Sequence, residues 1–192
     1  IPQRIHDFSQ KFKCESLPFK FIANGIFGYI SHEAVEYFDS IEINKKKSGF
    51  NIPEIYYAVY QNIIAISLFN HEAYLFSNIY AGSHNLEEIE VLLNSKKNSL
   101  FKFQKIGDKK SNLTDIEFIN FVKKAKEHCF RGDVFQLVLS RRFSQNFKGD
   151  EFNVYRTLRS INPSPYLFFF DYGDFKIFGS SPEAQLIVQD GK

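Results

Sequence analysis

Short strand-like runs separated by polar turns constrain the fold of this chain more than any other feature. Residues 55–60, 63–69 and 73–79 are rich in β-branched and aromatic side chains, and short polar segments separate them. Such runs are typical of strands joined by hairpins. They predict a three-stranded antiparallel meander.

Helix signals flank this meander. Ser31 has the position of an N-cap before a short helix with Ala34 and Val35 on one side, and residues 85–93 are typical of a second helix. The polar, glycine-containing segment 107–112 has the composition of a linker. We therefore expect the chain to divide into residues 1–107 and residues 112–192.

The second part begins with a helix whose two ends are both marked. Thr114 and Glu117 have the spacing of a capping box, and Gly132 is a suitable C-terminal cap for a helix that runs to about Phe130. The apolar stripe of this helix is Phe118, Phe121, Val122, Ala125 and Cys129. Strands are then expected at 134–143, 166–172, 175–178 and 185–188, with a helix at 151–161.

These signals together define a fold class. Strands outnumber helices, and short hairpin turns dominate the connections, as at Gly173-Asp174. A succession of hairpins gives antiparallel pairing, with the helices placed outside the sheets. We expect an α+β fold with largely antiparallel sheets and flanking helices.

Composition excludes several classes of function. The 192-residue chain has a formal net charge of +2, and no aromatic-basic platform accompanies its lysines, so nucleic-acid binding is not expected. No apolar run approaches the roughly 20 residues of a membrane span, so membrane association is not expected either. Cys14 and Cys129 lie far apart in the sequence. This pattern favours a reducing cytoplasm over a disulfide framework or a zinc site.

Both ends have the character of cuts through a longer chain. The sequence begins at Ile1 and contains no methionine. Near the other end, an apolar run leads into Asp190-Gly191, a strong hairpin signal, and no returning strand follows. The sequence therefore predicts that this chain is a fragment.

Three motifs follow one another in a fixed order between Arg131 and Glu183. They are Gly132-Asp133-Val134-Phe135-Gln136-Leu137-Val138-Leu139-Ser140-Arg141-Arg142-Phe143, Asn162-Pro163-Ser164-Pro165-Tyr166-Leu167 and Gly179-Ser180-Ser181-Pro182-Glu183. In this order and spacing they resemble the large subunit, component I, of anthranilate synthase, a family of chorismate-utilising enzymes. The segment Gly28–Glu33 also resembles the family's Gly-Tyr-x-Gly-Tyr-Asp segment, with departures at Ser31, His32 and Glu33.

The resemblance assigns a role to each part of the chain. Residues 1–107 are similar to the N-terminal, regulatory or scaffold region of component I. Residues 112–192 are similar to the first part of its chorismate-binding catalytic domain, which this chain holds incompletely. The resemblance covers nearly the whole chain and is most specific after Leu113.

Gln136 is the first candidate catalytic residue. Alternation along its strand places Val134, Gln136 and Val138 on one face, and a half-buried glutamine at a strand edge accounts for this pattern without any function. In the similar isochorismate synthases a lysine stands at this position and activates water. Because an amide cannot take a proton near neutral pH, Gln136 implies a reaction that uses ammonia in place of water.

Glu183 is the second candidate catalytic residue. Taken alone, Ser181, Pro182 and Glu183 also fit the start of a helix, with Ser181 as its cap. The resemblance instead implies that Glu183 is the general acid for the departing C4 hydroxyl of chorismate. The two interpretations conflict, because a helix N-terminus lowers a carboxyl pKa whereas a general acid at neutral pH needs a raised pKa.

The segment Asn162–Leu167 is the candidate inhibitor site. Two prolines separated by one residue favour a rigid, extended connection, which needs no ligand to explain it. The resemblance implies that Pro165, Tyr166 and Leu167 contact the feedback inhibitor tryptophan and that Asn162 supports the turn. The family's second wall for this pocket, a Leu-Leu-Glu-Ser motif, does not occur in this sequence.

The resemblance implies a Mg²⁺-dependent lyase of tryptophan biosynthesis. Chorismate and ammonia, which a glutamine amidotransferase subunit (component II) delivers, would give anthranilate and pyruvate. The Mg²⁺ ligands are expected outside this fragment, which would then be inactive alone. Two other interpretations stay open: component I of aminodeoxychorismate synthase, and a non-catalytic module that binds tryptophan or docks the amidotransferase.

Overall fold

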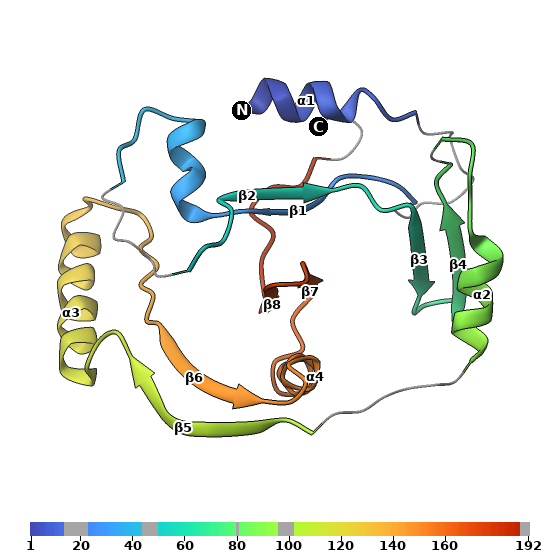
Figure 1. The fold of residues 1–192 in the computed structure, drawn as a ribbon. Helices are drawn as coiled ribbons and strands as arrows, with labels where there is room; N and C mark the ends of the chain where they lie inside the picture. The colour runs from blue at the N-terminus through green and yellow to red at the C-terminus, as the bar shows by residue number, and fades with distance from the viewer. Residues whose placement is uncertain (14–22, 44–49, 80, 96–101, 189–192) are drawn as a thin grey trace. The chain divides into compact units, whose positions relative to one another are not determined.

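The computed structural model describes residues 1–13, 23–43, 50–79, 81–95 and 102–188 (Figure 1). These residues form an α+β fold with antiparallel strand pairs, as the sequence predicts. In chain order the elements are α1 (Pro2–Ser9), β1 (Phe27–Ile30), the 3₁₀ helix η1 (His32–Tyr37), β2 (Ile55–Ala58), β3 (Asn62–Ser67), β4 (Glu72–Ser77), α2 (Leu86–Asn94), β5 (Gln104–Ser111), α3 (Asp115–Arg131), β6 (Phe143–Lys148), α4 (Phe152–Ile161), β7 (Tyr166–Asp171) and β8 (Lys176–Ser181).

The chain divides into two compact units. The first unit comprises residues 1–98 and 170–175, and the second comprises residues 99–169 and 176–192. The turn between β7 and β8 therefore groups with the N-terminal residues, while most of the two strands groups with the second unit. Each unit has its own strand pairs.

The first unit contains two separate antiparallel pairs. β3 pairs with β4 from Asn62 opposite Ser77 to Ser67 opposite Glu72. β2 pairs with β1, with Phe27 opposite Ala58, so the predicted three-stranded meander is wrong. The composition of each run correctly predicts a strand. The partner of β2, however, is β1, which lies some 25 residues earlier, and no residue pattern near β2 indicates that pairing.

Helix signals in this unit are only partly confirmed. α2 begins after Asn85, as expected from residues 85–93. η1 follows Ser31 and contains Ala34, but it is a 3₁₀ helix and the Ser31 side chain makes no capping hydrogen bond. Ala34 is the one fully buried hydrophobic side chain among the residues that the structure describes.

An aromatic cluster fixes the β7–β8 turn within the first unit. The ring of Tyr172 lies 4.4 Å from that of Tyr56 and 5.7 Å from that of Tyr29, centroid to centroid. Phe175 adds an edge-on contact at 6.5 Å from Tyr29. Burial in this cluster raises the pKa of the Tyr172 hydroxyl above its ordinary value. The turn is therefore held by apolar rings at the end opposite the two motifs that flank β7 and β8.

In the second unit, β5 pairs with β6 in an antiparallel ladder interrupted between Ile106 and Lys110. Residues 107–111 are thus the end of a strand, and the predicted linker at 107–112 is wrong. The segment resembles a linker because every residue of β5 is exposed and lysine, aspartate and glycine are depleted in strands. Backbone pairing with β6 overrides that composition.

α3 begins and ends where its capping signals place it. The Thr114 hydroxyl accepts a hydrogen bond from the Glu117 N–H at 3.3 Å, and Oε2 of Glu117 accepts one from the Thr114 N–H at 2.8 Å. At the other end Gly132 adopts φ 78°, and its N–H donates to the carbonyl of Cys129 at 3.1 Å. Both predicted caps are confirmed.

The capping box makes a prediction about pH. Hydrogen bonds from Thr114 lower the pKa of Glu117 below its ordinary value of 4.5. Glu117 therefore stabilises α3 fully above its unfolded pKa, and this contribution is lost as the pH falls through its lower folded pKa. Thr114→Ala keeps the backbone N–H, which is the larger cause of the lowered pKa, and removes only the hydroxyl. We therefore expect the Glu117 pKa to rise part of the way toward 4.5 in an NMR titration of its side chain, with a loss of helicity in α3. An unchanged titration midpoint would contradict this account.

Two predicted strands do not form. Residues 134–142 and 182–188 make no strand ladder with any other described residue, although β6 begins at Phe143. Their side-chain composition suits a strand, but a strand also needs a hydrogen-bonding neighbour. Val138 is 81% exposed and Phe135 is fully exposed, so the apolar faces of this segment are uncovered.

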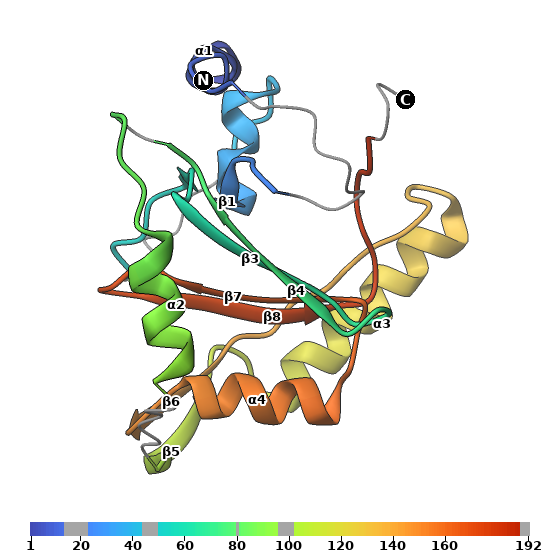
Figure 2. The same ribbon diagram turned by 90° about the vertical axis from the view of Figure 1, so that its right-hand side faces the viewer.

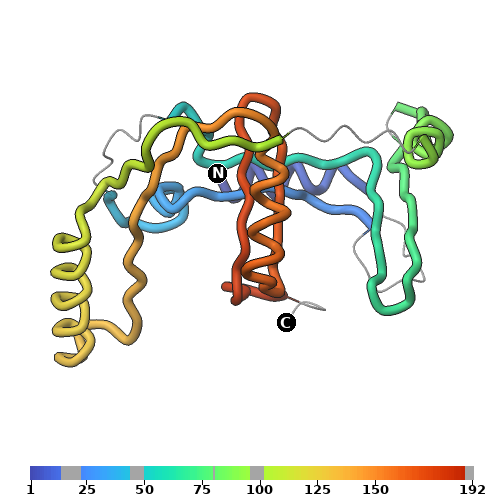
Figure 3. Tube along the Cα trace, turned by 90° about the horizontal axis from the view of Figure 1, so that it is seen from below, coloured from blue at the N-terminus to red at the C-terminus, as the bar shows by residue number. Residues whose placement is uncertain are grey.

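The remaining elements form a small aromatic layer. The N–H of Phe152 donates to Oδ1 of Asp150 at 2.9 Å, so the Asp150 side chain satisfies one backbone donor at the start of α4. The ring of Phe169 on β7 contacts those of Phe152 and Tyr155 on α4 and of Phe178 on β8. Figures 2 and 3 show α4 running along the β7–β8 pair. The predicted pairing across Gly173-Asp174 is confirmed.

Candidate functional site

The β7–β8 hairpin links two of the three sequence motifs. The Asn162–Leu167 segment leads from α4 into β7, and β8 ends at Ser181, directly before Pro182 and Glu183. The Ser180 hydroxyl donates a hydrogen bond to the Asn162 carbonyl at 2.7 Å. The first residue of the Asn162–Leu167 motif is therefore hydrogen-bonded to the second residue of the Gly179–Glu183 motif.

The Asn162–Leu167 segment forms a turn with its own hydrogen bonds. The N–H of Asn162 donates to the carbonyl of Leu158 at 2.8 Å, and the N–H of Ser164 donates to the carbonyl of Asn162 at 2.9 Å. Asn162, Pro165 and Tyr166 are exposed, while Leu167 is half-buried. This is the rigid turn that the two prolines predict, and it presents Pro165 and Tyr166 to solvent.

Glu183 lies on an exposed segment after β8 and not at a helix start. Residues 182–188 are not helical, so the interpretation of Ser181 as a helix N-cap is wrong. The Ser181 hydroxyl instead donates to the carbonyl of Glu183 at 3.0 Å. The Glu183 carboxyl is thus free of a helix dipole, and its backbone is fixed by the serine two positions before it.

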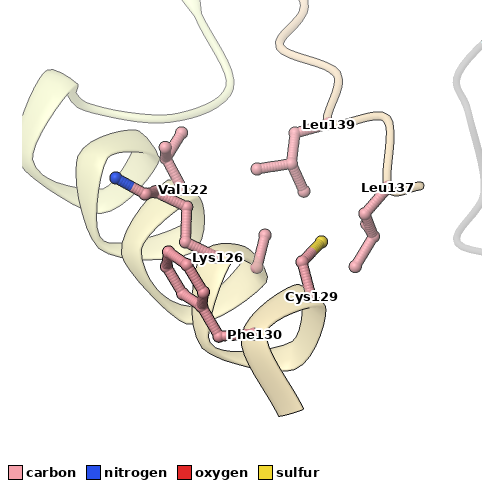
Figure 4. Close-up of a pocket in the computed structure, with 7 residues that line it drawn as sticks. Val122, Lys126, Cys129, Phe130, Leu137 and Leu139 are labelled. Atoms are coloured by element: carbon pink, nitrogen blue, oxygen red, sulfur yellow. The ribbon is translucent and has the colours of Figure 1, made fainter. Parts of the chain in front are cut away.

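Gln136 lies apart from this hairpin, on the segment beside α3. Leu137 and Leu139 face α3, where they line an open apolar groove of about 360 Å³ with Val122, Ala125, Lys126, Cys129 and Phe130 (Figure 4). Because side chains alternate along extended backbone, Gln136 lies on the side away from the groove. No hydrogen bond or ion pair within the described part of the chain joins Gln136 to Glu183. The described residues therefore show no direct polar contact between the two candidate catalytic residues.

Arg141 is a residue of the first motif that sequence reasoning passed over. Its guanidinium donates to Oγ of Ser111 at 2.8 Å, to Oδ1 of Asp115 at 2.7 Å and to the carbonyl of Leu113 at 2.7 Å. It also lies 4.8 Å from the ring centroid of Phe143. With a side chain only 18% exposed, Arg141 ties the end of β5 and the start of α3 to β6.

Loss of this arginine has a large expected cost. Arg141→Ala removes three hydrogen bonds from a charged donor, although the Leu113 carbonyl keeps the Ser111 hydroxyl as a donor at 2.7 Å. We therefore expect a loss of about 2–3 kcal/mol in the free energy of unfolding. Arg141→Lys should recover only part, because an ammonium lacks the planar fork that reaches three acceptors. Urea denaturation measures both, with Lys123→Ala on the exposed side of α3 as the control. Equal midpoints for Arg141→Ala and Lys123→Ala would contradict the assignment.

Metal and membrane features are limited in the described residues. No three His, Cys, Asp or Glu side chains among them gather as ligands for a metal ion. Mg²⁺ commonly takes one or two carboxylates together with water or substrate oxygens, and the ligands that the resemblance implies are expected outside this chain. None of the described helices is long and apolar enough to cross a bilayer.

Comparisons with known proteins converge on one family. A family model described as chorismate binding enzyme matches residues 3–192. Anthranilate synthase component 1 of Aquifex aeolicus is 31% identical over 182 residues, which are 88% of this chain and 37% of that protein. The Lactococcus lactis component 1 is 31% identical over 204 residues, which are 95% of this chain and 43% of that protein.

A solved structure shares the fold. The crystal structure of anthranilate synthase component I from Streptococcus pneumoniae matches with a TM-score of 0.67 and 26% identity, over 93% of this chain and 42% of that chain. The chain thus spans about two fifths of the length of these relatives. The α+β arrangement described above is the corresponding part of that fold. Because the family model covers nearly every residue, this chain belongs to the chorismate binding enzyme family.

Proposed function

We propose that this chain is part of the large subunit of an anthranilate synthase. The observation that carries the proposal is the match to component I, which extends over 93% of this chain in the solved Streptococcus pneumoniae structure. The order of the three motifs and the hairpin that joins two of them support the same assignment. The full reaction requires a polypeptide of the relatives' length.

The proposed reaction converts chorismate and ammonia to anthranilate and pyruvate. Ammonia adds at C2 and the C4 hydroxyl leaves as water with a proton from Glu183. Loss of the C2 proton and of the enolpyruvyl group, which takes up a proton at its methylene carbon and leaves as pyruvate, then gives the aromatic ring. Gln136 cannot act as a base toward water, which leaves ammonia as the favoured nucleophile. Mg²⁺, when bound, would supply charge to the substrate carboxylate.

The proposal extends to partners and regulation. Ammonia would come from glutamine through an amidotransferase subunit, and tryptophan would bind at the turn formed by Asn162, Pro165, Tyr166 and Leu167. The exposure of Pro165 and Tyr166 supports a contact role for that turn. Cys129 is an exposed free thiol, which suits a reducing compartment such as the cytoplasm.

The chain by itself should not complete the reaction. Gln136 and Glu183 are both exposed, and the described residues offer no set of Mg²⁺ ligands. We expect no anthranilate fluorescence when residues 1–192 are incubated with chorismate, Mg²⁺ and ammonia. Calorimetry with tryptophan and a pull-down with an amidotransferase subunit test the chain's binding roles. Anthranilate production by this chain alone would contradict the proposal that the reaction needs residues beyond this chain.

A further inference from the structure

The Asn162 carbonyl accepts two hydrogen bonds. One is the N–H of Ser164, at 2.9 Å, within the turn that precedes β7. The other is the hydroxyl of Ser180, at 2.7 Å, from β8 and 18 residues further along the chain. A carbonyl oxygen has two lone pairs, so both hydrogen bonds can exist together. This atom joins the turn to the strand that leads to Glu183.

The segment beyond Ser180 has little freedom of its own. The Ser181 hydroxyl donates to the Glu183 carbonyl at 3.0 Å, and Pro182 between them has a fixed φ. Only Ser181 and Pro182 therefore separate Ser180 from Glu183. The short connection between Ser180 and the Glu183 backbone is therefore constrained by a proline and one hydrogen bond.

The surroundings of this contact are held by α4. Nζ of Lys176 at the start of β8 lies 2.7 Å from Oε1 of Glu151. The ring of Phe178 packs edge-on against Tyr155 of α4 at 6.1 Å. β8 is thus packed on α4 along its length, and its last fixed point before Glu183 is the hydrogen bond from Ser180 to Asn162, at the C-terminal end of α4.

We propose that Ser180 is a positioning residue that couples the Asn162–Leu167 turn to Glu183. Its hydroxyl sets where the Glu183 segment leaves β8, and a shift of the turn moves Glu183 through the shared Asn162 carbonyl. The acid role of Glu183 rests on the proposed function. The coupling itself rests on the hydrogen bonds above and can be tested without activity.

NMR of residues 1–192 tests the coupling directly. In Ser180→Ala we expect the amide resonances of Ser164 and Glu183 to shift together, because both depend on the Asn162 carbonyl contact. Ser180→Thr retains the hydroxyl and should leave both close to wild type. The control is Ser144→Ala on the exposed face of β6, which should move neither. A Ser180→Ala spectrum in which Glu183 or Ser164 keeps its wild-type shift would overturn the proposal.

Kinetics of a full-length form test the consequence. Ser180→Ala should lower kcat by roughly ten-fold or more through a misplaced acid, with KM for chorismate within about two-fold, and Ser180→Thr should restore kcat. Pro163→Ala loosens the turn, and its effect should be less than additive with that of Ser180→Ala. Additive effects, or a change confined to KM, would contradict the coupling. Absence of anthranilate formation in the wild type would refute the proposed function and leave the NMR result standing.

Discussion

Glu183→Gln in a full-length form of the protein is expected to reduce kcat for anthranilate formation by at least about 100-fold. The amide keeps the size of the side chain but cannot donate the proton that the departing C4 hydroxyl requires, and general-acid catalysis typically contributes that much or more. Glu183 is exposed in this chain and fixed through its backbone, so the substitution does not remove a packing contact. Chorismate binding should be nearly unchanged.

Steady-state kinetics and chorismate calorimetry separate the two effects. Glu127→Gln is a suitable control, because it removes the same charge from an exposed position on α3. The control should retain wild-type kcat, and both variants should bind chorismate with wild-type affinity. Near-normal turnover by Glu183→Gln would rule out Glu183 as the general acid.

Gly28→Ala is expected to disrupt the β1–β2 pair. Gly28 lies opposite Tyr57 in the ladder, and a Cβ atom added to it would overlap the Tyr56 carbonyl oxygen. That oxygen belongs to backbone, which cannot rotate away as a side chain can. We expect a loss of about 3 kcal/mol or more in the free energy of unfolding, at the upper end of overpacking effects. The lack of space for a Cβ atom explains why the Gly28–Glu33 segment has a glycine at position 28, without any catalytic role.

Gly82→Ala provides the matched control in the same unit. Gly82 has φ 77° and open space around its Cβ position, so alanine there should cost only the roughly 1–2 kcal/mol of a left-handed backbone. Urea denaturation can be followed by tyrosine fluorescence, since the chain has 10 tyrosines and no tryptophan. If Gly28→Ala lowers the free energy of unfolding no more than Gly82→Ala does, the close approach of β1 and β2 is contradicted.

Features that depend on neighbouring residues could be predicted from the sequence. The capping box of α3 is a contact over three residues, and the Gly132 cap relieves a local backbone strain. The turn at Gly173-Asp174 is equally local and is confirmed by the pairing of β7 with β8. In each case the chemistry that decides the structure lies within the segment itself.

Features that depend on distant partners could not be predicted in this way. β2 was assigned to β3 by proximity in sequence, whereas the ladder joins it to β1. The exposed, charged composition of β5 predicts a linker, whereas pairing with β6 makes this segment a strand. Residues 134–142 illustrate the opposite error, since strand-like composition does not produce a ladder without a neighbour in the described residues.

In the candidate site, too, local motifs could be predicted from the sequence and contacts between distant residues could not. The motifs at Asn162–Leu167 and Ser180–Glu183 were recognisable from residue order, but their contact through Ser180 spans 18 residues and has no signature in either motif. The role of Arg141 was missed for the same reason, because its acceptors lie 26–30 residues earlier. A basic residue at the end of an apolar run was the available signal.

Product analysis of a full-length form tests the assignment most directly. With chorismate, Mg²⁺ and ammonia, the proposed function predicts anthranilate and pyruvate in equal amounts, resolved by chromatography with fluorescence detection. Formation of 4-amino-4-deoxychorismate without pyruvate would contradict the assignment and place the protein with the aminodeoxychorismate synthases.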